Sequence, residues 1–507
     1  MARAVTSATL VGVEAVPVAV EVDVTGGLPT VAIVGLADAA VREARVRVQS
    51  AIQNSRLTFP AGRISVNLAP AHLRKDGTGF DLPIALGILA AQGVLERRAL
   101  ESTLVIGELS LSGEVRPVRG VLAAAEAARQ AGLARVVVAP ENAEEAALVS
   151  GVEVRAVRTL SAAVAWFRAR DEGAAPRVVA TPAPPYDDLP LDLADVRGQP
   201  LARRALEIAA AGGHNLLFIG GPGSGKTMLA RRLPGILPPL ADEEAMEVTR
   251  IHSVAGLSRG GLMRTRPFRA PHHSTTPAGL VGGGSGMPRP GEISLAHRGV
   301  LFLDELPEFQ RATLEVLRQP LEASEVVVAR AWGSIRFPAR SQLVCAMNPC
   351  PCGHLSDPRK RCRCSAHDVA RYRARISGPL LDRIDLHVDV PPVELRDLES
   401  LTPGEPSAAV RARVQEARAR QEQRLGAGRT NAMMTSRELA ETARPDDEGR
   451  ALLRRAVERL GLSARAYERM LRVSRTLADL DGEPTVRARF VQEALFFRGL
   501  EQVGLAA

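Results

Sequence analysis

The stretch Asn215-Leu216-Leu217-Phe218-Ile219-Gly220-Gly221-Pro222-Gly223-Ser224-Gly225-Lys226-Thr227 decides the fold of this chain. Its apolar residues run directly into a glycine-rich loop that ends in Lys-Thr, which predicts a buried strand, a phosphate-binding loop and the start of a helix. In such a loop the backbone N–H groups turn inward, the lysine reaches the β- and γ-phosphates, and the threonine hydroxyl ligates Mg²⁺. The helix adds the positive end of its dipole beneath the anion. We therefore predict that ATP and Mg²⁺ bind at Gly220, Gly221, Pro222, Gly223, Ser224, Gly225, Lys226, Thr227 and Met228.

Two further apolar runs end in polar side chains that suit the same site. Val300-Leu301-Phe302-Leu303 is followed by Asp304 and Glu305, and the run 342–347 is followed by Asn348. Such runs fit parallel strands buried on both faces, whose carboxyl ends are where open α/β sheets place ligands. We expect Asp304 to hold Mg²⁺ through water, Glu305 to polarise the attacking water, and Asn348 to orient that water. An ordinary asparagine at a strand end is the alternative for Asn348.

An arginine follows a short predicted helix in Gly378-Pro379-Leu380-Leu381-Asp382-Arg383-Ile384-Asp385-Leu386. In ring ATPases an arginine in this place reaches the γ-phosphate bound by the neighbouring subunit and stabilises the transition state. We predict this role for Arg383. A local salt bridge to Asp382 or Asp385 is the alternative.

Composition bounds the class of protein. The 507 residues are 46% hydrophobic and 24% charged, which is typical of a soluble protein of about three domains. No apolar run approaches the roughly 18 residues of a membrane span, and Glu14, Glu21 and Asp23 interrupt the N-terminal apolar stretch, so we expect a cytoplasmic protein with no membrane contact. The formal net charge of +8 favours a polyanionic partner without establishing one.

The predicted fold class is α/β with an all-α C-terminal part. Residues 1–170 alternate strand-like runs with helical ones, 171–190 form a proline-rich linker, 191–394 contain the nucleotide motifs on a parallel sheet, and 395–507 form a helical lid. The strands expected in the first domain are 16–24, 30–34, 64–68, 104–106 and 136–139, and its expected helices are 37–54, 82–92 and 121–131.

The first domain resembles the proteolytic domain of Lon-type proteases. Lys75-Asp76-Gly77 before a helix and the run 107–115 carry the resemblance, which implies a Lon-like fold of the S5 domain 2 type for residues 1–170. The serine expected two places after the Lys-Asp-Gly is Gly79, and the expected lysine falls on Ala124. Covalent catalysis needs a nucleophile and a base, so we predict no active protease. An assembly platform and a scaffold without a ligand stay equally open.

The second half resembles the AAA+ ATPases related to magnesium chelatase, and most closely their YifB/ComM branch. The motifs that carry this resemblance are Asp195-Val196-Arg197-Gly198-Gln199, Arg266-Pro267-Phe268-Arg269-Ala270-Pro271-His272-His273, Gly291-Glu292-Ile293-Ser294-Leu295-Ala296-His297 and the Leu-Leu-Asp-Arg-Ile-Asp-Leu run. The resemblance implies a homo-hexameric ring and an ATP-driven DNA branch-migration helicase of natural transformation. It also implies that Arg465 is the second-sensor arginine of the lid, with Arg469 and Arg472 as competing positions.

Two segments are predicted to contact DNA. Between Glu247 and Glu292 the chain has arginines and histidines but no acid, and it is rich in glycine, as expected of projecting loops or hairpins. A second hairpin is predicted around the turn at Gly333. Arginines would meet phosphates, and a tryptophan would stack on a base. Binding of nucleotide or of a neighbouring subunit is the alternative. The candidate DNA-binding residues are Arg264, Arg266, Arg269, Arg330, Trp332 and Arg336.

Four of the five cysteines cluster at Cys350, Cys352, Cys362 and Cys364. Four thiolates are the ligand count of a closed tetrahedral Zn²⁺ site, although the single-residue spacing is tighter than the usual two to four. We predict structural zinc here, with His354 and His367 as reserve ligands. Four reduced surface thiols are the alternative.

The function predicted from these features is a Mg·ATP-dependent ring ATPase that translocates on DNA and drives branch migration, with recombination proteins as candidate partners. A chelatase-type motor that remodels a protein partner for metal insertion is the alternative. A non-motor interaction protein is disfavoured by the complete set of nucleotide motifs.

Overall fold

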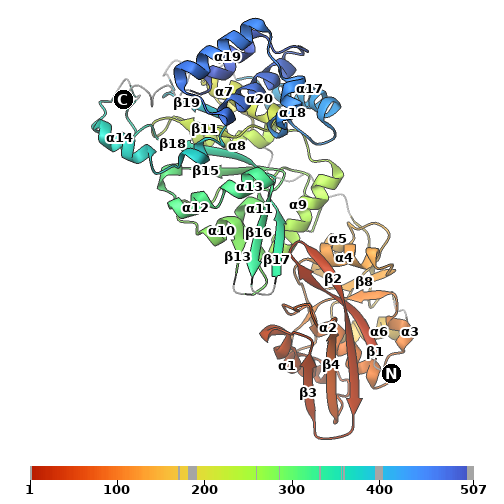
Figure 1. Cartoon of the computed structure of the whole chain (residues 1–507). Coiled ribbons are helices and arrows are strands. Elements are labelled where there is room, and N and C mark those ends of the chain that lie inside the picture. Colours follow the sequence, from red (N-terminus) through yellow and green to blue (C-terminus); the bar gives the residue numbers. More distant parts are fainter. Residues whose placement is uncertain are drawn as a thin grey trace.

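Two β-sheets organise the chain, one in an N-terminal body and one in a larger body that carries the C-terminal helices (Figure 1). The computed structural model describes residues 3–169, 172–180, 191–258, 260–284, 286–330, 333–355, 357, 360–393 and 404–498. None of the helices in these ranges has the length and apolar composition that a membrane-spanning helix requires.

The N-terminal body is built on an eight-stranded mixed sheet in the order β10-β9-β8-β5-β1-β2-β4-β3. Its strands are β1 (Arg3–Val11), β2 (Glu14–Thr25), β3 (Thr30–Val34), β4 (Arg63–Ala69), β5 (Thr103–Val105), β8 (Arg135–Val138), β9 (Glu153–Ala156) and β10 (Arg177–Val178). The helices are α1 (Ala39–Asn54), α2 (Asp81–Ala91), α3 (Arg97–Leu100), α4 (Val121–Gln130), α5 (Pro140–Ala146) and α6 (Leu160–Ala169), and β6 (Glu108–Leu109) pairs with β7 (Val115–Arg116). The strands and helices expected in this body are confirmed to within two residues at each end.

One boundary differs from the prediction. Residues 177–178, which we assigned to the linker 171–190, form β10 and pair antiparallel with β9 at the edge of the first sheet. The backbone pairing of Arg177 with Arg155 is a contact over a long sequence separation, which proline content could not indicate. Residues 171 and 181–190 of the predicted linker lie outside the described residues.

The larger body contains a five-stranded, wholly parallel sheet in the order β12-β15-β18-β11-β19. The strands are β11 (Leu216–Ile219), β12 (Phe268–Arg269), β15 (Val300–Leu303), β18 (Gln342–Met347) and β19 (Leu386–Asp389). The helices around it are α7 (Pro200–Gly212), α8 (Lys226–Ile236), α9 (Asp242–Ala255), α10 (Pro277–Val281), α11 (Glu292–Leu295), α12 (Arg311–Glu315), α13 (Arg318–Ala323), α14 (Ala366–Arg373) and α15 (Gly378–Leu381). The apolar runs that predicted buried parallel strands are buried at every position in β11 and β15, and the prediction is confirmed.

Two hairpins project from this sheet toward the N-terminal body (Figure 1). The first pairs β13 (Gly282–Gly283) with β14 (Arg289–Pro290), and the second pairs β16 (Glu325–Arg330) with β17 (Gly333–Pro338). Arg330 Nη2 donates to the Gly284 carbonyl oxygen at 2.9 Å, so the two hairpins lie side by side. The predicted hairpin at Gly333 is confirmed, and the glycine-rich segment, expected to form loops or hairpins, forms the first hairpin.

The C-terminal helices share one hydrophobic core with the parallel sheet. They are α17 (Ser407–Leu425), α18 (Ser436–Thr442), α19 (Asp447–Leu460), α20 (Ala464–Leu480) and α21 (Ala488–Phe496). Val414 of α17 and Leu477 of α20 belong to the same buried cluster as Leu206 of α7 and Leu229 of α8. Helix α8 is therefore held between the sheet and the C-terminal helices.

The two bodies meet where α4 packs against α9. Glu145 accepts hydrogen bonds from the Ser253 hydroxyl and from the Leu122 backbone, and Arg250 pairs with Glu126 at 3.4 Å. A second contact joins the first hairpin to the N-terminal body, because the Met287 N–H donates to Asp76 Oδ2 at 3.2 Å.

Candidate nucleotide site

The loop between β11 and α8 has a backbone that requires glycine. Gly223 and Gly225 have φ angles of +76° and +93°, in the left-handed region. A Cβ on Gly220 would collide with the carbonyl oxygen of Val390, the residue that follows β19. Because α8 begins at Lys226, its N-terminal backbone groups face this loop.

The Lys226 ammonium is turned into the loop. Its Nζ donates to the carbonyl oxygens of Gly220 and Gly221 at 2.6 and 2.9 Å, and to Asn348 Oδ1 at 3.3 Å. Burial lowers the pKa of Lys226, and the nearby charges of Asp304 and Glu305 raise it. A phosphate oxygen can replace these carbonyl partners as the acceptor for the ammonium without moving the side chain out of the loop.

Thr227 and Asp304 meet across the gap between α8 and the end of β15. Thr227 Oγ1 donates to Asp304 Oδ2 at 2.6 Å. A hydroxyl and a carboxylate held together in this way are oxygen ligands of the kind that Mg²⁺ prefers next to substrate phosphates. The donor set therefore fits a nucleotide-bound Mg²⁺.

Glu305 lies at the same edge of the sheet in a strained backbone conformation. Its φ is +52°, which is uncommon outside glycine and clusters at functional sites. Its side chain is 58% exposed and its Oε2 lies 3.3 Å from His273 Nδ1. We did not predict His273 as a site residue, although it ends a motif quoted for the family resemblance, and no spacing rule links it to Glu305.

The structure thus brings Lys226, Thr227, Asp304, Glu305 and Asn348 to one edge of the parallel sheet, at the carboxyl ends of β11, β15 and β18. The arrangement presents an ammonium, two potential Mg²⁺ ligands, an exposed carboxylate and an amide to one point. These groups can bind a nucleoside triphosphate and activate a water molecule.

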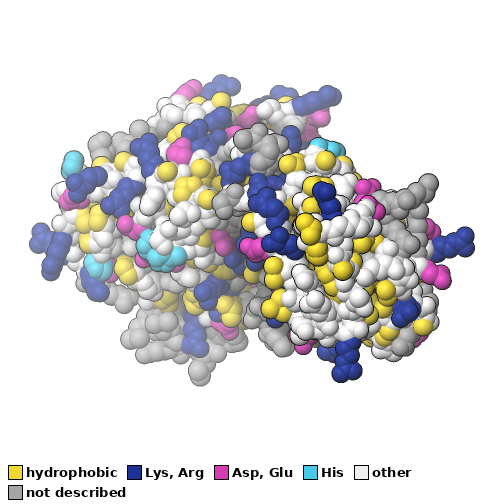
Figure 2. All heavy atoms as spheres, turned by 90° about the horizontal axis from the view of Figure 1, so that it is seen from below, with side chains coloured by type: hydrophobic (Ala, Val, Ile, Leu, Met, Phe, Trp, Pro, Cys, Tyr) yellow, Lys and Arg dark blue, Asp and Glu magenta, His cyan; other side chains and the backbone are white. Residues whose placement is uncertain are grey.

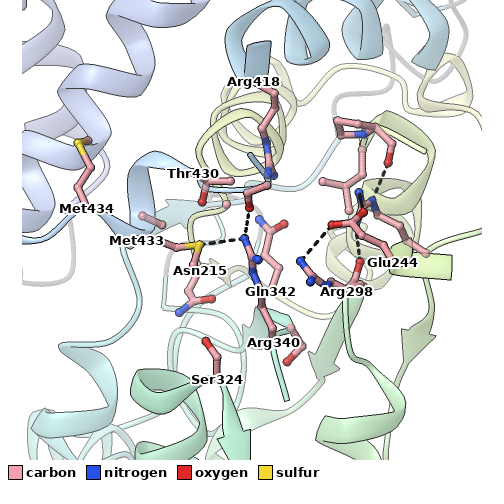
Figure 3. Close-up of a pocket in the computed structure, with 18 of the residues that line it drawn as sticks. Asn215, Glu244, Arg298, Ser324, Arg340, Gln342, Arg418, Thr430, Met433 and Met434 are labelled. Atoms are coloured by element: carbon pink, nitrogen blue, oxygen red, sulfur yellow. Dashed lines mark hydrogen bonds and ion pairs between the residues drawn. The ribbon is translucent and has the colours of Figure 1, made fainter. Parts of the chain in front are cut away.

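Arg383 and Arg465 lie at the opposite edge of this sheet. They line a pocket of about 960 Å³ whose wall includes Asn215 and Gln342, at the amino ends of β11 and β18 (Figure 3). The strands between this pocket and the phosphate loop are four to six residues long, at roughly 3.3 Å per residue, so both arginines lie a strand length away from the phosphate loop of their own chain.

The two arginines differ in their contacts. Arg383 is buried, it forms an ion pair with Glu322, and its Nη1 donates to the Pro379 carbonyl oxygen at 2.6 Å. Arg465 is exposed and has no hydrogen-bond or ion-pair partner in the part of the chain that the structure describes. Its two competitors are engaged, Arg469 with Asp385 at 3.7 Å and Arg472 with the Met434 carbonyl oxygen at 2.8 Å.

The wall of this pocket is a network of arginines and carboxylates. Glu244 pairs with both Arg266 and Arg298 at 3.1 Å, and the side chains of Arg340, just before β18, and of Arg418 on α17 converge (Figure 3). Burial lowers the pKa of Arg418 to about 9. The pocket is therefore a charged junction between the sheet and the C-terminal helices, unlike the apolar cavities that take small hydrophobic ligands.

The arginines of the acid-free segment have acidic partners from its flanks. Arg264 pairs with Asp242 at 2.8 Å, Arg266 is 15% exposed and pairs with Glu244, and Arg269 makes two bonds to Glu292 at 2.6 and 2.8 Å. In the folded chain, carboxylates of α9 and α11 therefore neutralise the arginines of the segment that has no acid of its own. These contacts give Arg266 and Arg269 a structural role, and their contact with DNA stays a prediction.

The second hairpin carries more accessible arginines. Arg336 is 72% exposed and pairs with Glu325, and Arg330 is exposed beside Gly284. Trp332 lies outside the described residues. Seen from the side of the N-terminal body, Lys and Arg side chains gather along the boundary between the two bodies (Figure 2).

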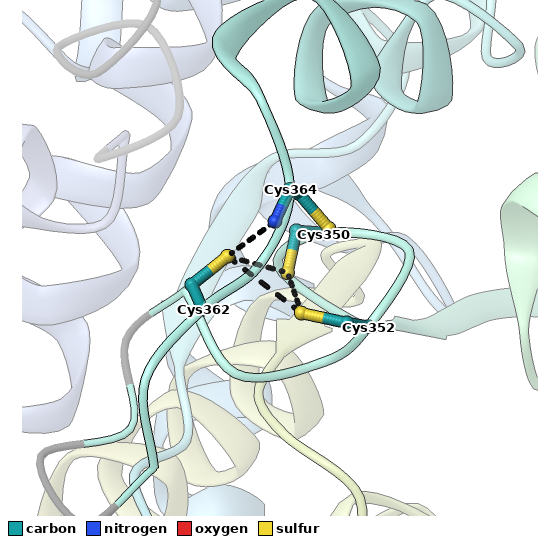
Figure 4. Close-up of side chains that lie close together, drawn as sticks. All are labelled: Cys350, Cys352, Cys362 and Cys364. Atoms are coloured by element: carbon teal, nitrogen blue, oxygen red, sulfur yellow. Dashed lines mark hydrogen bonds between the residues drawn. The ribbon is translucent and has the colours of Figure 1, made fainter.

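The four clustered cysteines converge on one point (Figure 4). Cys350 Sγ lies 3.4 Å from Cys352 Sγ and 3.7 Å from Cys362 Sγ, and the latter two are 3.6 Å apart. Tetrahedral thiolates at the usual Zn–S length of about 2.3 Å would lie roughly 3.8 Å apart. The Cys364 N–H donates to Cys362 Sγ at 3.4 Å, as backbone groups do around bound thiolates. The cluster fits a tetrahedral metal ion.

Gly79 stands at the position of the missing protease serine and Ala124 at that of the missing lysine, and Thr78 offers the neighbouring hydroxyl. Gly79 faces Ile106, Ala124 is buried in α4, and the Thr78 hydroxyl donates to Glu108. The absence of protease activity stays a prediction.

Comparison with known proteins covers nearly the whole chain. Residues 192–398 match the family described as magnesium chelatase, subunit ChlI; residues 20–142 match subunit ChlI of Mg-chelatase, and residues 404–498 match the C-terminal region of subunit ChlI. A shorter stretch of 93 residues is 33% identical to Lon protease 2 of Bacillus subtilis, covering 18% of this chain and 16% of that protein.

Full-length relatives have the same extent as this chain. The competence protein ComM of Haemophilus influenzae is 46% identical over 96% of both chains. An uncharacterized protein of Mycobacterium tuberculosis is 48% identical over 96% of both chains, and YifB of Escherichia coli is 43% identical over 97% of this chain and 96% of its own. The chain therefore belongs to the YifB/ComM family of magnesium-chelatase-like AAA+ ATPases.

Proposed function

We propose that this protein is a Mg·ATP-dependent motor that forms a homo-hexameric ring, translocates on DNA and drives branch migration. The observation that carries the proposal is the convergence of Lys226, Thr227, Asp304 and Asn348 at one edge of a parallel sheet. Membership of an ATPase family and the 46% identity to a competence protein support it, and they suggest natural transformation, with recombination proteins as further partners.

Each residue at the phosphate loop has a distinct part in the proposed hydrolysis. Lys226 compensates phosphate charge from within the loop, while Thr227 and Asp304 hold the Mg²⁺ that accompanies ATP. Glu305 accepts the proton of the attacking water, and Asn348 orients that water through its amide. His273, beside Glu305, keeps the carboxylate in place.

Arg383 and Arg465 take part only between subunits in this proposal. Both lie at the edge of the sheet opposite their own phosphate loop, so each would serve the nucleotide of a neighbour. To do so, Arg383 must break its ion pair with Glu322. We propose that assembly of the ring breaks this ion pair.

DNA is proposed to contact the hairpins that project toward the N-terminal body. The exposed arginines Arg330 and Arg336 and the basic boundary in Figure 2 favour a polyanion on this side. Trp332 would add stacking at the tip of the second hairpin.

The remaining assignments complete the proposal. The N-terminal body is a Lon-like domain without protease activity, for which the local similarity to Lon protease 2 gives limited support. The four cysteines hold structural Zn²⁺, for which the sulfur–sulfur distances speak.

The alternative is a motor that remodels a protein partner for metal insertion, which the chelatase similarity of residues 192–398 favours. Measuring ATP hydrolysis with and without single-stranded, duplex and four-way-junction DNA separates the two. Stimulation by DNA, strongest for the junction, is expected of the branch-migration motor. Hydrolysis that no DNA changes would favour the protein-remodelling alternative.

A further inference from the structure

The loop that carries the four cysteines lies directly on the phosphate loop. Gly353, next to Cys352, is buried and has a φ of +80°. A Cβ placed on Gly353 would come within 2.5 Å of Pro222 Cδ, and one on Gly221 within 2.9 Å of the Gly353 carbonyl oxygen. Real Cβ atoms do not approach other atoms so closely, so the two backbones touch here only because both residues are glycine.

Both ends of the cysteine loop are also tied to the nucleotide site. At its start, Asn348 accepts a hydrogen bond from Lys226 Nζ at 3.3 Å, and the Gly220 N–H donates to the Met347 carbonyl oxygen at 3.1 Å. At its end, Ser365 caps α14, and Tyr372 of that helix lies near the backbone of Asn348. Displacement of the cysteine loop would therefore disturb Pro222, Lys226 and Asn348 together.

The loop has little else to fix its shape. Its described residues between β18 and α14 form no helix or strand, and a few local contacts such as the His354–Asp357 ion pair accompany the four convergent thiols. Thiols without a metal make only weak S–H contacts, whereas four metal–thiolate bonds order a short loop strongly enough to determine its fold.

We propose that Zn²⁺ bound by Cys350, Cys352, Cys362 and Cys364 clamps Gly353 against Pro222, so that metal loading sets the conformation of the phosphate loop and hence its affinity for nucleotide. This inference rests on one part of the proposed function, namely that residues 220–227 bind ATP. Its structural part, a metal-dependent phosphate loop, is independent of hydrolysis and of DNA.

The test compares the full-length protein as purified anaerobically, after removal of metal by a chelator, and after return of Zn²⁺. Metal analysis should find one Zn²⁺ per chain. Amide hydrogen exchange of residues 220–227 should accelerate about tenfold or more without metal and recover when Zn²⁺ is returned. Affinity for a fluorescent ATP analogue should fall and recover in parallel, by about tenfold if one charged hydrogen bond is lost.

Three variants separate the clamp from general unfolding. Cys362→Ser removes a half-buried ligand and should behave like the stripped protein. Cys345→Ala removes the fifth, buried cysteine of β18 and should keep both Zn²⁺ and slow exchange. Gly353→Ala keeps all four ligands but drives a Cβ into Pro222, so it should retain Zn²⁺ while residues 220–227 exchange faster.

The proposal is overturned if anaerobically purified protein contains no Zn²⁺, or if exchange of residues 220–227 is unchanged by metal removal and by Gly353→Ala. Metal-dependent exchange in a protein that does not hydrolyse ATP would overturn the proposed motor function and leave the clamp standing.

Discussion

At the residue scale, the spacing of the phosphate loop predicted which side chains meet. Lys226 and Thr227 are fixed by local sequence, and Asp304 and Asn348 by the burial of the strands that precede them. Arg266 shows where this reasoning fails. The segment between Glu247 and Glu292 contains no acid, but Arg266 pairs with Glu244, which lies just outside it. His273 was missed because its approach to Glu305 depends on the packing of a loop.

The contrast between binding and hydrolysis tests the assignment of Glu305. Glu305→Gln keeps the size of the side chain but removes the base, so we expect ATP to bind normally and hydrolysis to fall by about 10²–10⁴-fold. Lys226→Ala, as the matched comparison, should lose binding itself. Equilibrium binding of labelled ATP and phosphate release measure the two effects. Hydrolysis by Glu305→Gln at the wild-type rate would refute the water-activating role.

At the element scale, long apolar runs were predictable and short pairings were not. The runs behind β3, β4 and β11 are bounded by turn residues, so their strands could be placed closely. The strands β10, β13 and β14 have only two residues each, and they exist because a partner strand is in place. Strand order was likewise not predictable. The opposite positions of Arg383 and the phosphate loop follow from strand direction, because Arg383 precedes β19 whereas the loop follows the parallel strand β11.

The contact between the first hairpin and the N-terminal body should depend on pH. Burial and the neighbouring Asp76 raise the pKa of Asp38 to about 6, and Asp76 accepts the Met287 N–H. Because the folded-state pKa of Asp38 lies above its ordinary 3.8, the stabilisation by its proton is complete below about pH 4 and is lost as the pH rises through about 6.

Asp38→Asn should therefore stabilise the protein at pH 8 and have little effect at pH 4.5. Asparagine caps α1 as aspartate does and can donate to Asp76 at any pH. After allowance for solvent screening we expect a gain of about 1 kcal/mol at pH 8. Urea midpoints and amide exchange of residues 286–290 at both pH values measure it, with the exposed Asp23→Asn as the control. An equal effect at both pH values would contradict the proposal that protonated Asp38 stabilises the contact with Asp76.

The second hairpin allows a quantitative test of DNA contact. Each phosphate neutralised contributes about −0.9 to the slope of log K against log salt on duplex DNA. Arg330→Ala with Arg336→Ala should flatten that slope by up to about 1.8. Arg437→Ala with Arg489→Ala makes the same charge change on exposed C-terminal helices and should leave the slope unchanged. Equal slopes for both double variants would remove the hairpin from the DNA site.

At the scale of the whole molecule, the position of Arg383 predicts complementation between defective subunits. An Arg383→Ala subunit retains an intact phosphate loop, and a Lys226→Ala subunit retains an intact arginine. In a random one-to-one mixture roughly a quarter of the interfaces join the two intact halves, so hydrolysis should rise well above that of either variant alone.

The control for this experiment is a mixture of Lys226→Ala subunits with Glu305→Gln subunits. Both changes damage the same side of the interface, so no arrangement of subunits restores a complete site. Recovery in the control, or none in the Arg383 mixture, would show that Arg383 does not act between subunits.

If Arg383 acts between subunits as proposed, its separation from the phosphate loop across the sheet gives every subunit a donor face and an acceptor face. A chain of this kind can complete an active site only head to tail, because the partners of a two-fold symmetric dimer are equivalent and neither arginine would meet the other's phosphate loop. Isolated chains should accordingly hydrolyse almost no ATP. The specific activity should climb steeply as protein concentration increases and collapse on dilution, even when ATP remains saturating.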